Sequence, residues 1–228
     1  MRLSSFLPTT VASAVVFSAI AAPPALSQFQ DPATSTSVIA QVSAEELVNR
    51  GREKLAQQDY QEAIENLTQA VRNNPELATA YYNRSSAYLE LGEYQKVIED
   101  TTQALQINSD LADAYLNRSA ARVGLGEYQK AIKDASQALQ INPNLALAYN
   151  NRSAARLELG EYQKAIEDAS QALQINPNLG LAYYNRGISH YKLGNEQAGD
   201  EDLEKAGEIF LYQAGSQVAQ SLIRELLQ

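Results

Sequence analysis

The chain repeats itself every 34 residues, and this period constrains its fold more than any other feature. An Asn-Arg pair recurs five times at this spacing, with the asparagines at Asn49, Asn83, Asn117, Asn151 and Asn185. A fixed period of this length is typical of stacked repeats, in which each unit buries its apolar faces only against its neighbours. Such an array has a long curved surface rather than a central cleft. The usual role of that surface is to hold another polypeptide.

Each period predicts two helices joined by a turn. In the unit Ala112–Leu145, Gly126 follows the first helical pattern, and glycine accepts the left-handed conformation that ends a helix. A second amphipathic run begins at Tyr128. Asn142 and Pro143 then predict the start of the next unit, with Asn as the N-cap and Pro as the first helical residue.

The repeated residues resemble the tetratricopeptide repeat family. That family has a large residue at position 4 of its unit, Ala at position 27 and Pro at position 32. Position 4 is Leu47, Tyr81, Tyr115, Tyr149 and Tyr183, and position 27 is Ala70, Ala104, Ala138, Ala172 and Ala206. Position 32 is proline in three units, as Pro75, Pro143 and Pro177. The resemblance implies an all-α, right-handed superhelical solenoid of five helix-turn-helix units, at residues 44–77, 78–111, 112–145, 146–179 and 180–213.

The fifth unit lacks the proline, and the first has Gln58 in place of the turn glycine. After the fifth unit, Gly215 and Ser216 predict a break in the chain. An apolar stripe follows at Val218, Leu222, Ile223 and Leu226. We therefore expect a separate capping helix over residues 214–228 that covers the open face of the fifth unit.

The first 27 residues are typical of a secretory signal. Arg2 precedes a short apolar run at Val11–Ala22, and small residues before Gln28 predict a cleavage site there. An uncleaved anchor is the alternative; after cleavage no stable membrane span is expected. We thus expect an exported protein of bacterial type, periplasmic or secreted. Residues 28–43 are expected to be a flexible linker, ending in a capping box made by Ser43 and Glu46.

Composition argues against several functions. The chain has 27 acidic and 18 basic side chains among its 228 residues, a formal net charge of −9, which disfavours nucleic-acid binding. It has no cysteine and only one histidine, His190. Metal sites and catalytic groups built from these residues are therefore not expected, and neither is a cofactor or an enzymatic activity.

The five asparagines are candidate ligand-binding residues. In the tetratricopeptide family, position 6 of each unit faces the concave groove, so the resemblance implies a ladder of Asn49, Asn83, Asn117, Asn151 and Asn185 along it. A carboxamide both donates and accepts hydrogen bonds, so such a ladder can pair with the backbone of an extended peptide. The alternative is that asparagine is a polar surface residue copied by duplication.

The third and fourth units differ at 5 of their 34 positions, and four differences fall at first-helix positions expected to line the groove. These four are Asp113/Leu147, Leu116/Asn150, Val123/Leu157 and Gly124/Glu158. The expected groove residues beside the ladder are Tyr82, Leu116, Leu147, Asn150, Leu181, Tyr184 and Ile188. They suit an extended protein segment with apolar side chains.

The arginines at position 7 have a structural explanation. Arg84, for example, is expected to pair with Asp100 of the second helix, and three further units repeat this Arg–Asp spacing. Arg122 and Arg156 extend a basic stripe that either accepts a partner carboxylate or neutralises nearby acids. We interpret the chain as a noncatalytic adaptor that holds an extended peptide in its groove. The alternative is a structural module that self-associates into homo-oligomers.

Overall fold

The computed structural model describes residues 42–226, with side chains through Gly215. In this part of the chain all regular structure is helical, which confirms the all-α prediction. The paired helices are α1 (Ala44–Ala56) and α2 (Tyr60–Asn73), α3 (Ala78–Glu90) and α4 (Tyr94–Ile107), α5 (Ala112–Gly124) and α6 (Tyr128–Ile141), α7 (Ala146–Glu158) and α8 (Tyr162–Ile175), and α9 (Gly180–Lys192) and α10 (Glu196–Leu226).

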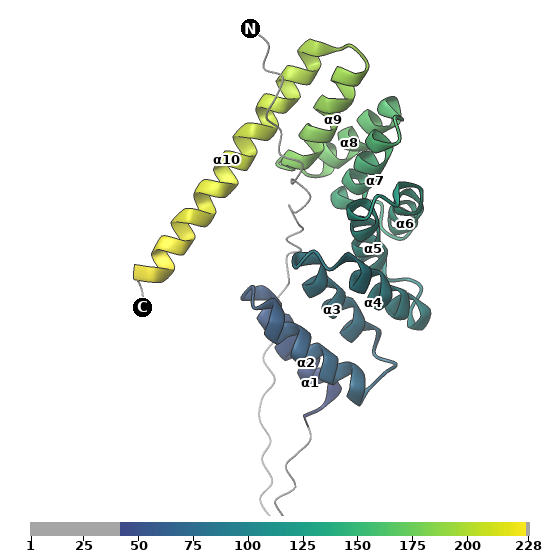
Figure 1. Ribbon diagram of the computed structural model, residues 1–228, viewed down its shortest axis with the longest axis vertical. Helices are drawn as coiled ribbons and strands as arrows, with labels where there is room; N and C mark the ends of the chain where they lie inside the picture. The colour runs from purple at the N-terminus through teal and green to yellow at the C-terminus, as the bar shows by residue number, and fades with distance from the viewer. Residues whose placement is uncertain (1–41, 227–228) are drawn as a thin grey trace, which may run out of the picture.

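The pairs stack into a curved solenoid (Figure 1). Each first helix contacts the first helix of the next pair, in the series α1, α3, α5, α7 and α9. Among the described residues, the second helices α2, α4, α6 and α8 make no such contacts with one another. First helices are therefore closer together than second helices, so they form the inside of the curve.

Small residues allow the helices to approach closely. The alanine at position 27 is fully buried in each of the first four units. Four alanines on the first helices are also fully buried, namely Ala80, Ala114, Ala148 and Ala182. Gly51 shows how tight the packing is, because a Cβ added there would lie 2.5 Å from Cγ of Leu67. The Ala-rich sequence thus determines the spacing between helices.

Turn residues end the first helices as expected. Gly92, Gly126, Gly160 and Gly194 have positive φ angles of 71° to 81°. Gln58 occupies the same place in the first unit with φ of 62°, and it is the only residue other than glycine with a positive φ in the described part of the chain. Ser43 caps α1 by accepting a hydrogen bond from the backbone N–H of Glu46 at 3.1 Å, as the predicted capping box requires.

The role predicted for Asn142 and Pro143 is wrong. Asn142 ends α6 as its C-cap, and its backbone N–H donates to the Ala138 carbonyl at 2.8 Å. Its side-chain oxygen accepts from the backbone N–H of Asn144 at 3.0 Å, which makes an Asx turn. The next helix begins only at Ala146. Asn-Pro therefore terminates one unit instead of starting the next.

The predicted separate capping helix is also wrong. Helix α10 runs without a break from Glu196 to Leu226, through Gly215 and Ser216 (Figure 1). The first four units end at an Asn C-cap, whereas the fifth has Phe210 at that position and Leu211 where three units have proline. Without this stop signal the helix continues, since one glycine inside a helix costs only about 1 kcal/mol. Leu211 and Tyr212 are exposed and cover no part of the fifth unit.

None of the helices in the described part is both long and apolar enough to cross a membrane. The expected signal at residues 1–27 lies outside the described residues, as does the expected linker up to residue 41. Val42 packs against the first core cluster, and its carbonyl accepts a hydrogen bond from Asn73 at 3.1 Å. The end of the expected linker is therefore part of the first unit.

Candidate protein-binding face

We call the surface of α1, α3, α5, α7 and α9 that is turned away from the second helices the inner face. The exposure of each side chain on this face decides whether it can contact a ligand.

Three asparagines of the ladder bind the preceding repeat. Nδ2 of Asn117 donates to the Ser85 and Ser86 hydroxyls at 3.3 and 3.0 Å. Nδ2 of Asn151 donates to the Ser119 hydroxyl at 2.9 Å and to the Leu116 carbonyl at 3.4 Å. Both N–H groups of each carboxamide are thus used within the chain.

Asn185 donates to the side-chain oxygen of Asn150 at 3.0 Å and is only 6% exposed. Asn83 donates to the Thr79 carbonyl of its own helix at 2.7 Å, and Asn49 is exposed at the N-terminal end. The N–H groups of Asn117 and Asn151 are therefore not free for the predicted pairing with a peptide backbone. The asparagines mainly connect successive first helices.

Most of the first-helix positions at which the third and fourth units differ also lie in contacts between repeats. Leu116 and Asn150 are both buried, and Leu116 packs in a cluster with Tyr115, Tyr149 and Ala148. Their replacement changes how one first helix meets the next. The sequence suggested that this replacement alters an exposed groove residue, but both side chains are buried.

Gly124 and Glu158 both meet a tyrosine from the preceding unit. A Cβ added to Gly124 would lie 2.6 Å from the Tyr94 ring. Glu158 instead interacts with the Tyr128 hydroxyl; the pKa of Tyr128 is raised by burial and by this carboxylate. Position 13 therefore lies in a contact between repeats. Glycine there allows close approach of the tyrosine ring, whereas glutamate interacts with the tyrosine hydroxyl.

An apolar stripe remains open on α9. Leu181, Tyr184 and Ile188 recur at helical spacing, are not fully buried, and include Tyr184 at 38% exposure. Leu147 holds the position of Leu181 in the preceding unit and is partly buried against the cluster that contains Leu116 and Ala148. The predicted apolar surface therefore exists at the C-terminal end of the inner face.

The inner face is more polar between the first and third units. Tyr82 of α3 lies near Asp113 of α5 and Arg52 of α1, and burial together with the Asp113 charge raises the pKa of the Tyr82 hydroxyl. Burial also raises the pKa of the Asp113 carboxyl. Asp113 has no salt-bridge partner within residues 42–215, so its charge is open to a ligand.

The predicted Arg–Asp pairs are confirmed in four units. Each arginine donates through Nε and Nη2 to both carboxylate oxygens, at 2.7 to 2.9 Å, in the pairs Arg84–Asp100, Arg118–Asp134, Arg152–Asp168 and Arg186–Asp202. This bidentate geometry fixes the first helix of a unit against its second helix.

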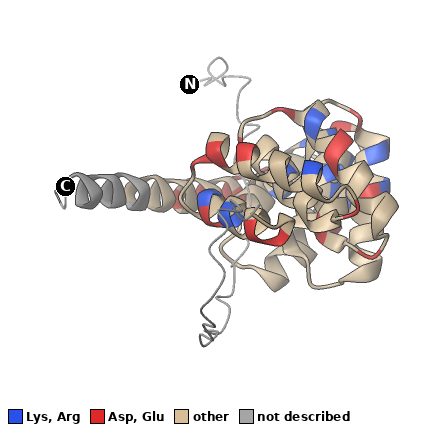
Figure 2. Cartoon of the chain, turned by 90° about the horizontal axis from the view of Figure 1, so that it is seen from below, with Lys and Arg blue, Asp and Glu red and all other residues tan. Residues whose placement is uncertain are grey.

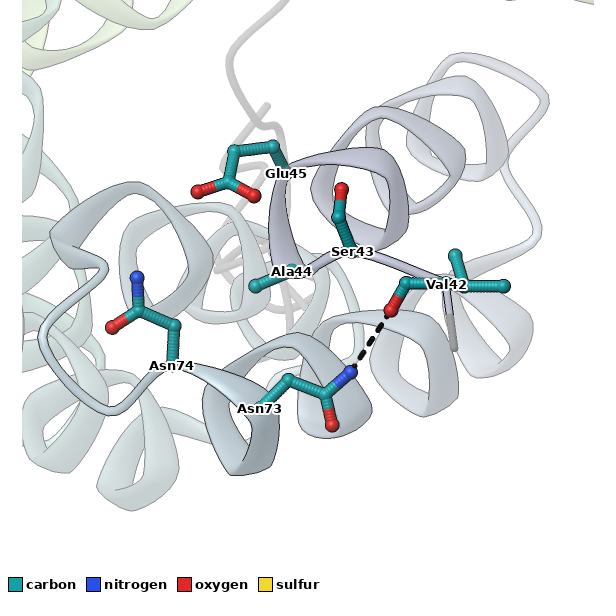
Figure 3. Close-up of a pocket in the computed structure, with 6 residues that line it drawn as sticks. All are labelled: Val42, Ser43, Ala44, Glu45, Asn73 and Asn74. Carbon is teal, nitrogen blue, oxygen red and sulfur yellow. Dashed lines mark hydrogen bonds between the residues drawn. The ribbon is translucent and has the colours of Figure 1, made fainter. Parts of the chain in front are cut away.

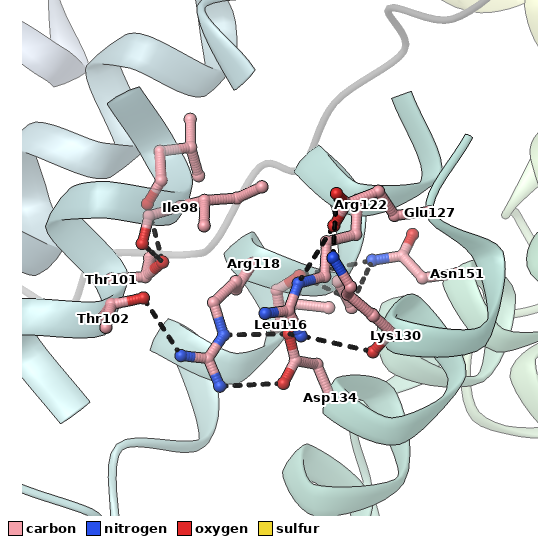
Figure 4. A network of polar contacts seen from close by, with 12 residues as sticks. Ile98, Thr101, Thr102, Leu116, Arg118, Arg122, Glu127, Lys130, Asp134 and Asn151 are labelled. Atoms are coloured by element: carbon pink, nitrogen blue, oxygen red, sulfur yellow. Dashed lines mark hydrogen bonds and ion pairs between the residues drawn. The ribbon is translucent and has the colours of Figure 1, made fainter. Parts of the chain in front are cut away.

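Each of these arginines also reaches the preceding unit, a contact that the sequence reasoning missed. Nη1 donates to a hydroxyl at position 25, namely Thr68, Thr102, Ser136 or Ser170, at 3.0 to 3.3 Å. Figure 4 shows Arg118 between Asp134 and Thr102. A hydroxyl at position 25 of the first four units, 16 residues before each of these arginines, was the available signal.

Arg122 and Arg156 do not form a ligand-binding stripe. Nη1 of Arg122 donates to Oδ2 of Asp134 at 2.6 Å, and Nη1 of Arg156 makes the same bond to Asp168. Two arginines therefore share one buried carboxylate in the third and fourth units, and Figure 4 shows this arrangement in the third. This confirms the alternative that these arginines neutralise acids on the adjoining helix.

A shallow hollow of about 380 Å³ lies at the N-terminal end of the solenoid. It is lined by Val42–Glu45 together with Asn73 and Asn74, and Figure 3 shows the hydrogen bond from Asn73 to Val42. Its walls are mostly backbone and amide groups. No group of three potential metal ligands occurs among the described residues. Acidic and basic residues alternate over the repeats (Figure 2).

Sequence comparison now places the chain in a family. Profiles described as tetratricopeptide repeat match residues 48–114 and 112–145, and a profile described as TPR repeat matches residues 154–194. The chain belongs to the tetratricopeptide repeat family. A comparison with curated proteins gives no match.

Solved structures share the fold. A crystal structure of MamA is 24% identical, with a TM-score of 0.62 over 72% of this chain and 96% of that one. MamA from Desulfovibrio magneticus RS-1 is 19% identical, with a TM-score of 0.64 over 75% and 96%. YrrB, described as a TPR protein with an unusual peptide-binding site, is 19% identical, with a TM-score of 0.61 over 80% and 94%. These structures show the same fold, and membership of the tetratricopeptide repeat family indicates a protein-interaction scaffold.

Proposed function

We propose that this tetratricopeptide protein is a noncatalytic adaptor that binds an extended protein segment along its inner face. The observation that carries the proposal is the open stripe of Leu181, Tyr184 and Ile188 on α9. Aromatic and aliphatic side chains of this kind anchor protein ligands. The peptide-binding site described for YrrB supports this use of the fold.

The charges of the inner face suggest the chemistry of the segment. Asp113 is an exposed carboxylate whose charge acts on the Tyr82 hydroxyl, and a carboxylate of this kind attracts a cationic side chain. Beyond it, positions that hold carboxylates in the first and third units hold Leu147 and Leu181. We therefore propose a ligand with one Lys or Arg near Asp113 and apolar residues over the last two units.

A random peptide display library, selected on the full chain, tests both parts of this proposal. Enriched sequences should combine apolar residues with one basic residue at a constant spacing. In Asp113→Leu, which copies the residue of the next unit, the basic preference should disappear while apolar residues stay enriched. In Tyr184→Ser combined with Ile188→Ser, enrichment should fall at least tenfold.

The selection distinguishes failure of peptide binding on the inner face from failure of the role proposed for Asp113. If no peptide is enriched, or if the Tyr184/Ile188 variant selects as well as the parent, peptide binding on this face is wrong. If apolar peptides are enriched without a basic residue, only the role of Asp113 is wrong. Asp113 should also make affinity for a basic peptide fall as pH drops through its pKa, which burial raises above the usual range. Titrations with Asp113→Leu should lack this decline.

Export remains a proposal based on residues 1–27. A basic residue, a short apolar run and small residues before Gln28 support it. Sequencing the N-terminus of the protein recovered from outside the cytoplasm should give Gln28 as the first residue. Recovery of the chain only inside the cytoplasm, with Met1 present, would contradict export.

A further inference from the structure

The most exposed large apolar side chains in the described part of the chain lie at the end of the fifth unit, on α10. Leu211 is 76% exposed and Tyr212 is 79% exposed, whereas the other large apolar residues on the surface are less than half exposed. Val218 and Leu222 follow Leu211 in the sequence at spacings of 7 and 11, which fall on one side of a helix. This segment, Leu211–Leu226, is the α10 extension.

Of the other helices in residues 42–226, α10 contacts only α9. The extension adds 16 helical residues, about 24 Å, beyond the last turn that packs there. Because the helix does not break at Gly215, the extension cannot turn back onto the fifth unit. Figure 1 shows it leaving the stacked repeats as one straight rod. The exposed side chains of Leu211 and Tyr212, at the start of this rod, are therefore available to another molecule.

The distribution of charge along α10 indicates which kind of partner the extension can contact. Residues 196–208 of α10 hold six acidic side chains and one basic side chain, but the extension has only Arg224 and Glu225. In a chain of net charge −9, the extension is thus a neutral segment where two copies can meet without repulsion. The acidic part of α10 disfavours approach to an anionic membrane surface.

We propose that the α10 extension pairs with the α10 extension of a second copy in an antiparallel, two-fold symmetric dimer. Antiparallel pairing places the two acidic stretches at opposite ends, whereas parallel pairing would bring them side by side. A helix of this length is only marginally stable alone, so pairing also stabilises the helix itself. The interface is small, and a dimer in rapid exchange with monomer is expected.

Sedimentation of the full chain over a range of concentrations tests the proposal. The parent protein should show a concentration-dependent monomer–dimer equilibrium. Leu211→Glu combined with Tyr212→Gln should weaken dimerisation at least tenfold, without loss of the repeats, because both side chains are exposed in the monomer. The matched control is Leu91→Gln with Leu125→Gln, which also removes two exposed apolar residues. The control should dimerise like the parent.

A parent protein that is monomeric at every concentration, or a Leu211/Tyr212 variant that dimerises normally, would overturn the proposal. So would a monomeric parent that floats with phosphatidylcholine vesicles through these residues, since the face would then be a membrane anchor. Orientation is tested with Gln213→Cys, because the chain has no native cysteine. In the antiparallel dimer the two Gln213 positions lie about 16 Å apart and cannot form a disulfide. A rapid disulfide would show parallel pairing.

Discussion

At the scale of single residues, polar side chains determine how neighbouring repeats are placed. Asn117 and Asn151 donate to hydroxyls of the preceding first helix, while Arg118 and Arg152 donate to hydroxyls of the preceding second helix. The third and fourth units are therefore each attached to the preceding unit at two points besides their apolar contacts. Buried polar groups of this kind are specific because leaving one unpaired is costly.

Replacing Asn117 and Asn151 together with Ala should destabilise the protein. Each substitution removes hydrogen bonds between repeats and leaves buried hydroxyls without a donor, so the free energy of unfolding should fall by about 1 kcal/mol per site. Urea denaturation measures this. Asn49→Ala is the control at the same position of the first unit, and it should leave stability unchanged or slightly raised. Equal effects at all three sites would contradict the connecting role.

Replacing Asp134 with Asn should have a larger effect. The change leaves Arg118 and Arg122 without their shared carboxylate in a site where Asp134 is almost fully buried. We expect a loss of about 3 kcal/mol in unfolding free energy. Lys133→Ala, on the exposed side of the same helix, should change it little. A variant as stable as the parent would show that Arg118 and Arg122 do not depend on Asp134.

At the scale of helices, the end of each second helix depends on its stop signal. The first four end at Asn74, Asn108, Asn142 and Asn176, each in an extended conformation. The fifth has no such residue, and α10 continues. One missing turn thus converts the end of a repeat into a projecting helix.

Restoring a stop signal should separate the extension from the fifth unit. Leu211→Pro removes a backbone donor and clashes with the preceding turn, so the extension should lose helicity while the repeats remain folded. Circular dichroism at 222 nm should decrease relative to the parent. Gly215→Ala is the opposite change and should increase helicity, because Gly215 has no positive φ. An unchanged spectrum in Leu211→Pro would contradict the continuous helix.

At the scale of the whole molecule, stability is shared between neighbours. Contacts join each helix only to those of its own unit and the adjacent units, so no single core holds the chain together. Because the units follow one period, one of them can be removed without breaking the register of the others.

Deleting residues 146–179 should therefore give a folded protein with four units. Leu145 would be followed by Gly180, which begins a first helix as Ala146 does. Helicity per residue should stay the same, while the denaturant dependence of unfolding should fall by about a fifth with the surface removed. The midpoint should also be lower, since one interface between repeats is lost. A chain that fails to fold would show long-range contacts beyond nearest neighbours.

The sequence alone determined the period, the helical class, the left-handed turn glycines and the Arg–Asp pairs. These follow from local rules: helical spacing, the freedom of glycine, and charges 16 residues apart in an antiparallel helix pair. The open stripe at Leu181, Tyr184 and Ile188 was also predictable, because its residues are apolar at first-helix positions.

Only the tertiary structure decided which way the remaining polar residues point. Asn117 looks the same in the sequence whether its carboxamide meets a ligand or Ser86, and the difference depends on how close the preceding helix lies. The same is true of Arg122, because its hydrogen bond to Asp134 depends on how the two helices pack. Whether a side chain is exposed depends on the distance between neighbouring repeats, and that distance is set by all the small residues packed between them.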